Sequence, residues 1–315
     1  MNGGGTMTRR ERFEAALAFA PIDRPPVGVW LHFASEHLAP AQVAELHVAY
    51  QEAYDWDFVK VMNDERLPLG DGGDLSSADA LHAVKPLAPD APALAKQLEV
   101  VRRIRDAVGP DVPVVETLFD PLQTLIRSAG RSALALVRSA PGPARDALRA
   151  VEETLVGYVG ALREAGADGV FYSINGAIPA EHGGLDGREF DELCAPFDRA
   201  VLEAAHGLVR IGHVHGYALA FDRVRDYPVE AFNWSHRHVE PSLAQAREIT
   251  DRALIGGIDE LAFASQTLGE AELGVRRAVA EAGRAGLIIG PGCTVPPDTP
   301  ARLLHGVRRV VEGLG

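Results

Sequence analysis

Two histidines separated by a single residue, His213 and His215, are the side chains whose spacing first suggests chemistry. They lie in an apolar stretch, residues 209–216, that is typical of a short buried strand ending in a turn at Gly216. Side chains two positions apart on a strand share a face, so both imidazoles are expected to point the same way where the chain leaves the sheet. Two adjacent neutral imidazoles form half of a transition-metal site; a hydrogen-bonded histidine pair is the alternative.

The composition limits the class of protein to which the chain can belong. Its 315 residues are 47% hydrophobic and 24% charged, which suits one α/β barrel or two ordinary domains. A net charge of -13 argues against nucleic acid as a partner, because phosphate binding needs clustered Lys and Arg. Two cysteines form no disulfide framework. Neither a secretory signal nor an apolar run of about 18 residues is present, so we expect a cytoplasmic protein that does not bind a membrane.

The elements that would position the histidines are short apolar runs that alternate with longer helical segments. Eight runs have the length and apolar content of buried strands: 27–31, 58–62, 112–117, 169–174, 209–216, 231–234, 253–258 and 287–290. Segments of helical periodicity separate them: 41–53, 91–108, 121–130, 144–165, 190–205, 243–250, 270–285 and 299–312. A further helix, which begins at a capping box formed by Thr8 and Glu11, precedes the first strand.

This alternation predicts a single (β/α)8 barrel, the TIM-barrel fold of the α/β class, over residues 7–315 with an N-terminal helical extension. Residues 1–6 are interpreted as a disordered alternative start or a cloning remnant outside the fold. A doubly wound open sheet is the rival architecture. The first predicted strand is not followed by a phosphate-binding glycine motif, which argues against that rival.

In a barrel of this kind the active site lies where the strands end. That rule gathers a set of side chains around one mouth: Trp30, His32, Asn63, Asp64, Glu116, Asp120, Ser173, His213, His215, Asn233, Asp259 and Cys293. Tyr172 is a candidate wall of an apolar pocket, although core packing explains it nearly as well, and His236 is either solvated or faces the substrate. The residues predicted to bind substrate are Trp30, His32, Asn63, Tyr172, Asn233 and His236.

Three segments resemble the uroporphyrinogen decarboxylase superfamily. They are Arg12-Phe13 with Pro-Ile-Asp-Arg-Pro-Pro at 21–26, Phe-Tyr-Ser at 171–173 continuing to Ala-Pro-Phe-Asp-Arg at 195–199, and Gly-Pro-Gly-Cys-Thr-Val-Pro-Pro-Asp-Thr-Pro at 290–300. The resemblance implies a (β/α)8 barrel. The superfamily includes the decarboxylase of the haem pathway and zinc-dependent methyltransferases that move methyl groups between corrinoid proteins and thiols such as coenzyme M.

The chain departs from the decarboxylase branch at two places. That branch carries an Arg-rich segment after the first strand, where this chain has Val-Trp-Leu-His-Phe-Ala at 29–34, and the histidine of its Gly-His-Gly motif is replaced by Pro291. Its Asp after the second strand is matched by Asn63 or Asp64, and its Ser after the fourth strand by Ser173. Because several fixed cations are needed to bind the acetate groups of uroporphyrinogen, we predict no useful activity on that substrate.

The methyltransferase branch carries His-x-Cys after the fifth strand and a Cys in Pro-Gly-Cys near the C-terminus. This chain has His213-Val214-His215 and Pro291-Gly292-Cys293, so the resemblance implies a zinc site in which one Cys ligand is changed to His. Two His and one Cys leave the fourth position of a tetrahedral zinc ion for the substrate. The change makes the site one charge unit more positive, which weakens a substrate thiolate as a nucleophile without excluding methyl transfer.

The leading hypothesis is therefore zinc-dependent methyl transfer between a corrinoid, or another methyl donor, and a small thiol. His213, His215 and Cys293 would hold the metal, and a corrinoid protein would be the partner. Decarboxylation of a porphyrinogen or a smaller acid is the alternative, with Asp64 stabilising a developing cation and Ser173 orienting a carboxylate. A non-catalytic metal- or corrinoid-binding protein is the third hypothesis. The resemblance also leaves a homodimer open.

Overall fold

The computed structural model describes residues 6–69, 75, 77–130 and 132–315, so residues 1–5 of the predicted start segment lie outside the described part. Within it, seven parallel strands form one sheet in the order of the sequence. The strands are β1 (Val59–Val61), β2 (Val114–Phe119), β3 (Gly169–Ile174), β4 (Val209–Val214), β5 (Ala231–Asn233), β6 (Ala253–Ile258) and β7 (Leu287–Pro291). Sequential parallel neighbours are what repeated βαβ units produce, and the curled sheet is TIM-barrel-like.

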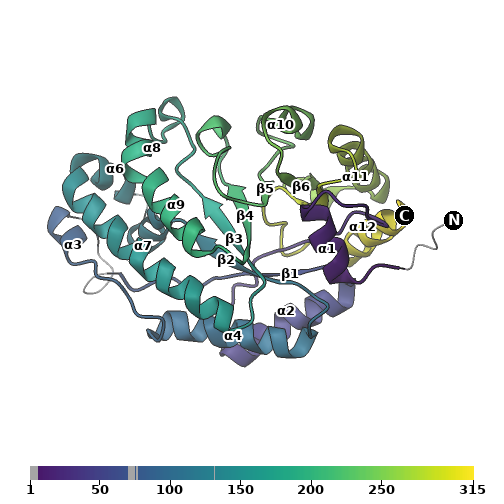
Figure 1. Ribbon diagram of the computed structural model, residues 1–315, viewed down its shortest axis with the longest axis horizontal. Helices are drawn as coiled ribbons and strands as arrows, with labels where there is room; N and C mark the ends of the chain where they lie inside the picture. The colour runs from purple at the N-terminus through teal and green to yellow at the C-terminus, as the bar shows by residue number, and fades with distance from the viewer. Residues whose placement is uncertain (1–5, 70–74, 76, 131) are drawn as a thin grey trace.

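Helices lie outside the sheet and connect its strands (Figure 1). They are α1 (Arg9–Leu17), α2 (Pro40–Tyr54), α3 (Ala78–His82), α4 (Pro92–Val108), α5 (Pro121–Ala129), α6 (Ser132–Ser139), α7 (Pro141–Glu164), α8 (Gly187–Leu193), α9 (Ala195–Ala204), α10 (Leu243–Ile249), α11 (Leu268–Ala282) and α12 (Ala301–Glu312). Three short 3-10 turns are η1 (Ala180–His182), η2 (Phe221–Arg223) and η3 (Phe263–Ser265). The helix predicted at 190–205 is in fact two, α8 and α9, separated at Cys194.

The strand predicted at residues 27–31 is not formed. Val27 makes one isolated parallel bridge with Ile289, and its carbonyl oxygen accepts a hydrogen bond from the Asp57 amide at 2.8 Å. The segment therefore lies between β7 and β1, where an eighth strand would close the barrel. The Gly28 amide donates to the Ile289 carbonyl at 3.0 Å, whereas the Val27 amide donates to the Asp57 carboxylate at 2.8 Å instead of to a neighbouring strand. The described sheet thus has seven strands instead of the predicted eight.

Alternate side chains of the strands face the inside of the curled sheet, as a period of two requires. The interior cluster consists of Phe13, Ala16, Trp30, Phe58, Met62, Val115, Phe171, Ile211, Ala231, Ala253, Ile255 and Ile288. Phe13 and Ala16 belong to α1, which begins at the predicted capping box of Thr8 and Glu11. The Phe13 and Phe58 rings lie 5.1 Å apart, so α1 covers the amino ends of the strands. Their carboxyl ends lie at the opposite end of the barrel.

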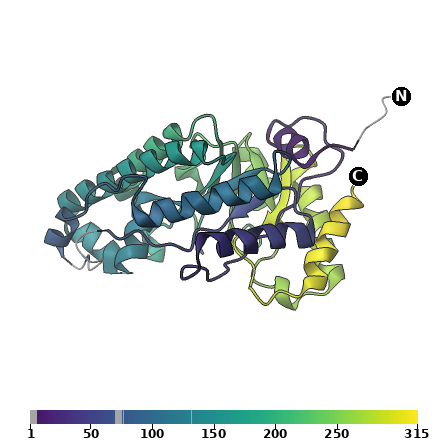
Figure 2. The same ribbon diagram turned by 90° about the horizontal axis from the view of Figure 1, so that it is seen from below.

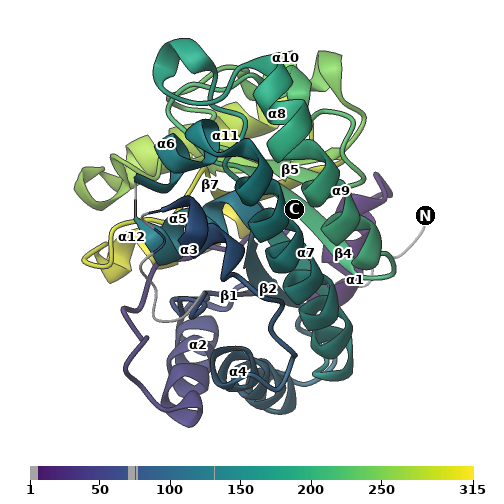
Figure 3. The same cartoon turned by 90° about the vertical axis from the view of Figure 1, so that its left-hand side faces the viewer.

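The outward faces of the strands pack against the helices in a second and larger apolar cluster. Figure 2 shows α2 and α4 side by side along one face, and the two helices are in contact. Figure 3 shows the strands at the centre with α2, α4, α7 and α9 around them. No helix in the described part of the chain is long and apolar enough to cross a membrane. Because the helices cover the outer faces of the strands, the loops that follow the strands carry the candidate site.

Candidate metal centre and substrate pocket

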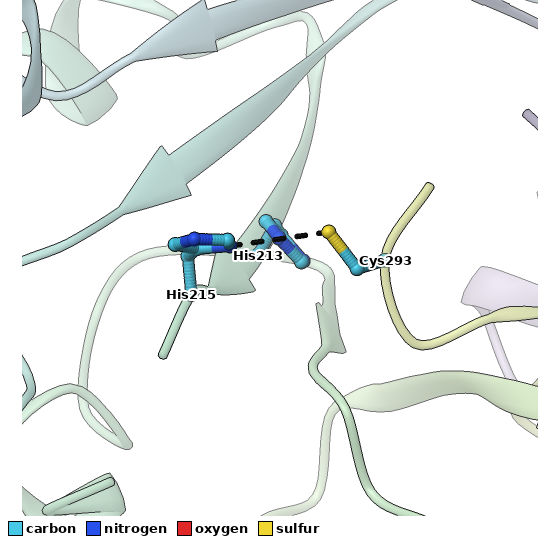
Figure 4. Close-up of side chains that lie close together, drawn as sticks. All are labelled: His213, His215 and Cys293. Carbon is cyan, nitrogen blue, oxygen red and sulfur yellow. Dashed lines mark hydrogen bonds between the residues drawn. The ribbon is translucent and has the colours of Figure 1, made fainter. Parts of the chain in front are cut away.

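Three side chains with metal-binding atoms converge at the carboxyl end of the sheet. His213 lies near the end of β4, His215 directly follows this strand, and Cys293 lies in the loop after β7. One donor atom from each lies within 4.8 Å of the other two, and Figure 4 shows the three side chains pointing toward one another. Two imidazoles and one thiolate are a donor set that fits a zinc ion with an open fourth position. We call these three residues the triad.

Asn233 on β5 determines how His213 is oriented. The Nδ1 of His213 lies 2.7 Å from the Asn233 side-chain oxygen, while the Asn233 amide nitrogen donates to the backbone oxygens of Ile255 and Pro291 at 3.1 and 3.0 Å. Since both of these partners are carbonyls, the amide nitrogen must face them and the Asn233 oxygen must accept from Nδ1–H of His213. The lone pair of Nε2 is then free for a metal.

The electrostatics of the triad favour the thiolate form of Cys293. Burial raises the pKa of this thiol, but the adjacent His213 and His215 imidazoles more than offset that effect and bring the pKa to about 4. Conversely, the Cys293 side chain, whose Sγ lies 3.9 Å from Nδ1 of His215, raises the pKa of His215. The thiolate is the form of cysteine that binds metals, so Cys293 is already in its ligand state at neutral pH.

A cavity of about 200 Å³ adjoins the triad. The predicted site residues that line it are Trp30, His32, Ser173, His213, His215 and Cys293. Ser173 and His213 are directly opposite each other in the register of β3 and β4, which explains why both face the interior. His32 is held by Asp64, whose carboxylate lies 2.6 Å from Nδ1 of the imidazole. The cavity therefore combines aromatic walls with a small number of fixed polar groups, as ligand sites commonly do.

Asp64 itself does not line the cavity. Besides His32, its carboxylate accepts hydrogen bonds from the backbone and side chain of Ser35, at 3.1 and 3.0 Å. Burial opposes ionisation, but these hydrogen bonds lower the pKa of Asp64 below its usual range. The predicted catalytic carboxylate is thus an ionised group that positions His32, and its oxygens are already occupied.

Tyr172, predicted as a wall of the substrate pocket with core packing as the alternative, points away from the cavity. Its side chain lies on the face of β3 opposite to Ser173 because successive residues of a strand alternate. The ring is fully buried, and the hydroxyl donates to Asp198 at 2.8 Å. Tyr172 therefore packs β3 against the helical layer, which is the core-packing alternative.

Asn63, Asn233 and His236 also lie outside the lining of the cavity. The Asn63 amide nitrogen donates to Glu116 at 3.0 Å, and Asn233 holds His213 as described above. His236 is buried, and its Nε2 accepts a hydrogen bond from the Gly257 backbone at 3.3 Å. All three side chains are held by hydrogen bonds to other parts of the protein.

Lys60 on β1 lines the cavity and was missed by the sequence analysis. Only 8% of its surface is exposed, and its Nζ donates to the Thr117 hydroxyl and the Met62 sulfur, each at 2.9 Å. The Phe171 ring lies 4.4 Å from Nζ, in cation–π geometry. Burial lowers the pKa of Lys60 to about 7. Lys60 could have been recognised in the sequence as the single charged residue inside the apolar run at 58–62.

Arg127 on α5 is a second cation that the sequence analysis overlooked. Its guanidinium lies 3.9 Å from the Phe119 ring centre and donates to the backbone oxygen of Glu65 at 3.1 Å. Arg66, in the loop after β1, is exposed and does not line the cavity. The cavity thus contains two cationic side chains from separate parts of the chain.

Comparisons with known proteins agree with this architecture. The family model of uroporphyrinogen decarboxylase matches residues 72–313. A methyltransferase from Methanosarcina mazei has a TM-score of 0.79 at 17% identity, with 98% of this chain and 99% of that chain covered. A B12-independent methionine synthase from Shewanella sp. W3-18-1, in complex with selenomethionine, has a TM-score of 0.60 at 13% identity, with 92% and 94% covered. At these identities the structural likeness establishes the fold.

No curated protein sequence matches the chain. The family model nevertheless covers well over half of it, including β2 to β7 and all three residues of the triad. The resemblance noted in the sequence is confirmed by this match, and the chain belongs to the uroporphyrinogen decarboxylase family.

Proposed function

We propose that the protein transfers a methyl group to the sulfur of a small thiol. The observation that carries this proposal is the convergence of His213, His215 and Cys293 beside a cavity, with Asn233 directing the free nitrogen lone pair of His213 toward them. Three protein donors with room for one more ligand are typical of catalytic zinc sites and not of structural ones, which use four. The overall likeness to a methyltransferase fold supports the same conclusion.

The triad residues would hold a zinc ion through Nε2 of His213, one imidazole nitrogen of His215 and the Cys293 thiolate. When bound, zinc supplies Lewis acidity that favours the thiolate form of a substrate thiol. Trp30 and Phe171 form apolar walls that limit water around the reacting sulfur. The chain's own part in the reaction is to hold the ligands, exclude water and orient the substrate.

In the proposed reaction the substrate thiol releases its proton to solvent, and its sulfur forms a bond to the methyl carbon. The bond between that carbon and the donor breaks, and its electron pair stays with the donor. A methylated corrinoid, on a separate carrier protein, is the donor class that we propose. This donor would approach from the carboxyl ends of the strands, because α1 covers the other end of the barrel.

The geometry gives less support to decarboxylation. The proposed cation-stabilising carboxylate, Asp64, already binds His32 and Ser35 and does not line the cavity. A volume of about 200 Å³ is below the roughly 300–1,000 Å³ of pockets that hold drug-sized ligands, which suits a substrate much smaller than a porphyrinogen. Ser173 lines the cavity and remains available to orient a substrate group in either reaction.

The experiment is to measure zinc and methyl transfer in wild type and in Cys293→Ala. Wild type should carry about one zinc per chain and should demethylate methylcobalamin in the presence of small thiols. Cys293→Ala should lose most of its zinc affinity and the activity, since it removes the one anionic ligand.

His182→Ala is the matched control. This exposed histidine lies in the loop after β3, at the same end of the barrel, and is not among the described side chains that could together hold a metal ion. Its replacement should leave zinc content and methyl transfer unchanged. Full zinc content in Cys293→Ala, or equal loss in both variants, would contradict the proposed site.

A further inference from the structure

A second group of metal-binding side chains lies at the carboxyl end of the sheet and shares no residue with the triad. His238 lies in the loop after β5, and Asp259 and Glu260 directly follow β6. One donor atom from each of these residues lies within 4.8 Å of the other two. The sequence predicted Asp259 at the mouth of the barrel, but the proposed reaction does not use it. We call these three residues the second cluster.

Glu260 distinguishes the second cluster from an ordinary group of surface charges. Only 2% of its surface is exposed. Its Oε2 is buried and has no hydrogen-bond partner in the described part of the chain. Burying a carboxylate costs free energy unless a cation or a hydrogen-bond donor meets it, because the interior solvates an anion poorly. Glu260 is therefore a buried acid that lacks a partner from the chain itself.

Close packing confines the Glu260 side chain. A Cβ built on Gly292 would lie 2.7 Å from Oε2 of Glu260 and 2.6 Å from Cα of Ser235. The loops after β5, β6 and β7 thus meet at this point and leave no space for a side chain at position 292. The Glu260 carboxylate is held beside this junction, with one of its oxygens directed at the other members of the second cluster.

Hydrogen bonds fix the other two side chains. Oδ1 of Asp259 accepts a hydrogen bond from the Ala262 amide at 3.1 Å and lies 2.7 Å from Nε2 of His238. His238 is exposed and Asp259 is half-buried, so an ion can reach the cluster from solvent. A neutral imidazole can carry its proton on Nδ1 and present the Nε2 lone pair to the ion. Binding then exchanges one hydrogen bond for metal coordination and needs no change in the number of bound protons.

We propose that His238, Asp259 and Glu260 bind a divalent metal ion of the oxygen-preferring class, which Mn²⁺ represents. Two carboxylates balance the charge of the ion, the imidazole is the third protein ligand, and water completes the coordination shell. The two carboxylates outweigh the single positive charge of Arg237, which precedes His238 in the same loop. The bound ion gives Glu260 the partner that it lacks and links the loops after β5 and β6.

The second cluster differs from the triad in the chemistry of its donors. A thiolate is part of the triad and favours zinc, whereas the second cluster has no sulfur and two carboxylates, which suit manganese. The inference does not depend on the proposed function, since none of the three residues takes part in methyl transfer.

Titration with Mn²⁺, followed by electron paramagnetic resonance, tests the site because the sharp signal of free Mn²⁺ decreases on binding. The full-length protein is first loaded with one equivalent of zinc, so that the triad is occupied. Wild type should then bind about one Mn²⁺ per chain, as one set of protein ligands implies. Glu260→Gln and His238→Ala should each weaken binding at least about tenfold, because even residues that only orient a ligand contribute that much.

Glu240→Gln is the matched control. Glu240 is an exposed carboxylate in the same loop as His238, it accepts a hydrogen bond from the Ser242 amide at 3.1 Å, and it belongs to neither group of ligands. This variant should keep the wild-type affinity for Mn²⁺. Failure of wild type to bind Mn²⁺, or equal affinity in wild type, Glu240→Gln, Glu260→Gln and His238→Ala, would overturn the inference, since the latter result indicates weak binding to surface acids.

Urea unfolding of the zinc-loaded protein gives a second readout. Without Mn²⁺, Glu260→Gln should be at least as stable as wild type, because it removes a buried charge that has no partner. Mn²⁺ should raise the unfolding midpoint of wild type and not that of Glu260→Gln, since an ion that binds only the folded state stabilises it. An equal rise in both proteins would contradict the assignment of Glu260 as a ligand.

Cys293→Ala separates the second cluster from the triad. We expect this variant to lose zinc and methyl transfer, yet it should bind Mn²⁺ as wild type does, because Cys293 is not part of the second cluster. Conversely, His238→Ala should keep its zinc. Loss of Mn²⁺ binding in Cys293→Ala together with full binding in His238→Ala would show that Mn²⁺ occupies the triad, and would overturn the inference.

Discussion

Replacing Lys60 by methionine should make the protein more stable, and the gain should depend on pH. Methionine has a similar length, stays apolar and fills the same space between Phe171 and Met62, whereas the ammonium is buried with neutral partners. Burial is the main cause of its lowered pKa, and the negative charges of Cys293, Glu116 and Asp64 offset that effect only in part.

The size and the sign of the expected change in the free energy of unfolding follow from this pKa. A fall from 10.5 to about 7, at 1.36 kcal/mol per pKa unit, means that burying the charged form costs roughly 4–5 kcal/mol. Loss of the hydrogen bond to Thr117 destabilises the variant by about 1 kcal/mol. The free energy of unfolding of Lys60→Met should therefore exceed that of wild type by about 3 kcal/mol below pH 7. Between pH 7 and 10.5 the unfolded wild type binds more protons than the folded one, so wild-type stability rises with pH and the gain shrinks.

Urea unfolding of both proteins at pH 6 and pH 10 measures this difference directly. We expect Lys60→Met to exceed wild type clearly at pH 6 and to match it, or fall slightly below it, at pH 10. Thr117→Val serves as control, because it removes the same hydrogen bond, together with the one that the Thr117 hydroxyl donates to the Val61 carbonyl at 2.6 Å, without removing the charge. It should destabilise by a similar amount at both pH values. A Lys60→Met variant that is less stable than wild type at pH 6, or whose difference from wild type does not change with pH, would refute the reasoning.

Two further predictions concern the triad. Asn233→Leu removes the acceptor that fixes the His213 tautomer, so zinc affinity should fall about ten- to a hundredfold, the range typical of partners that orient a ligand. Competition with a chromophoric chelator measures this affinity. An unchanged affinity would show that the hydrogen bond is dispensable. His215→Cys restores the ligand pattern of the thiol methyltransferases and lowers the charge of the site by one unit, so zinc should be retained and the rate of methyl transfer to a given thiol should persist or rise. A His215→Cys protein that loses its zinc would contradict the assignment of this position as a ligand.

Much of the site could be predicted from the sequence because it depends on local rules. The period of two along a strand put His213 and His215 on one face, and the motif ending in Cys293 placed the thiol after the last strand. The seven observed strands coincide with seven of the apolar runs, to within a few residues at their ends. The same local rule, applied to residues 172 and 173, already implies that Tyr172 and Ser173 face opposite ways.

Only the tertiary structure decided which groups lie together and what they do. Lys60 and Arg127 are 67 positions apart in the chain, and they reach one cavity because β1 pairs with β2 and α5 begins directly after β2. Asn233 binds His213 because β5 pairs with β4 in a register that places the two residues side by side. The segment at 27–31 forms one bridge and not a strand, and the Val27 amide is bound by the side chain of Asp57, a residue 30 positions away. Local periodicity determines which face a side chain is on, whereas contacts between distant segments depend on how the whole sheet closes.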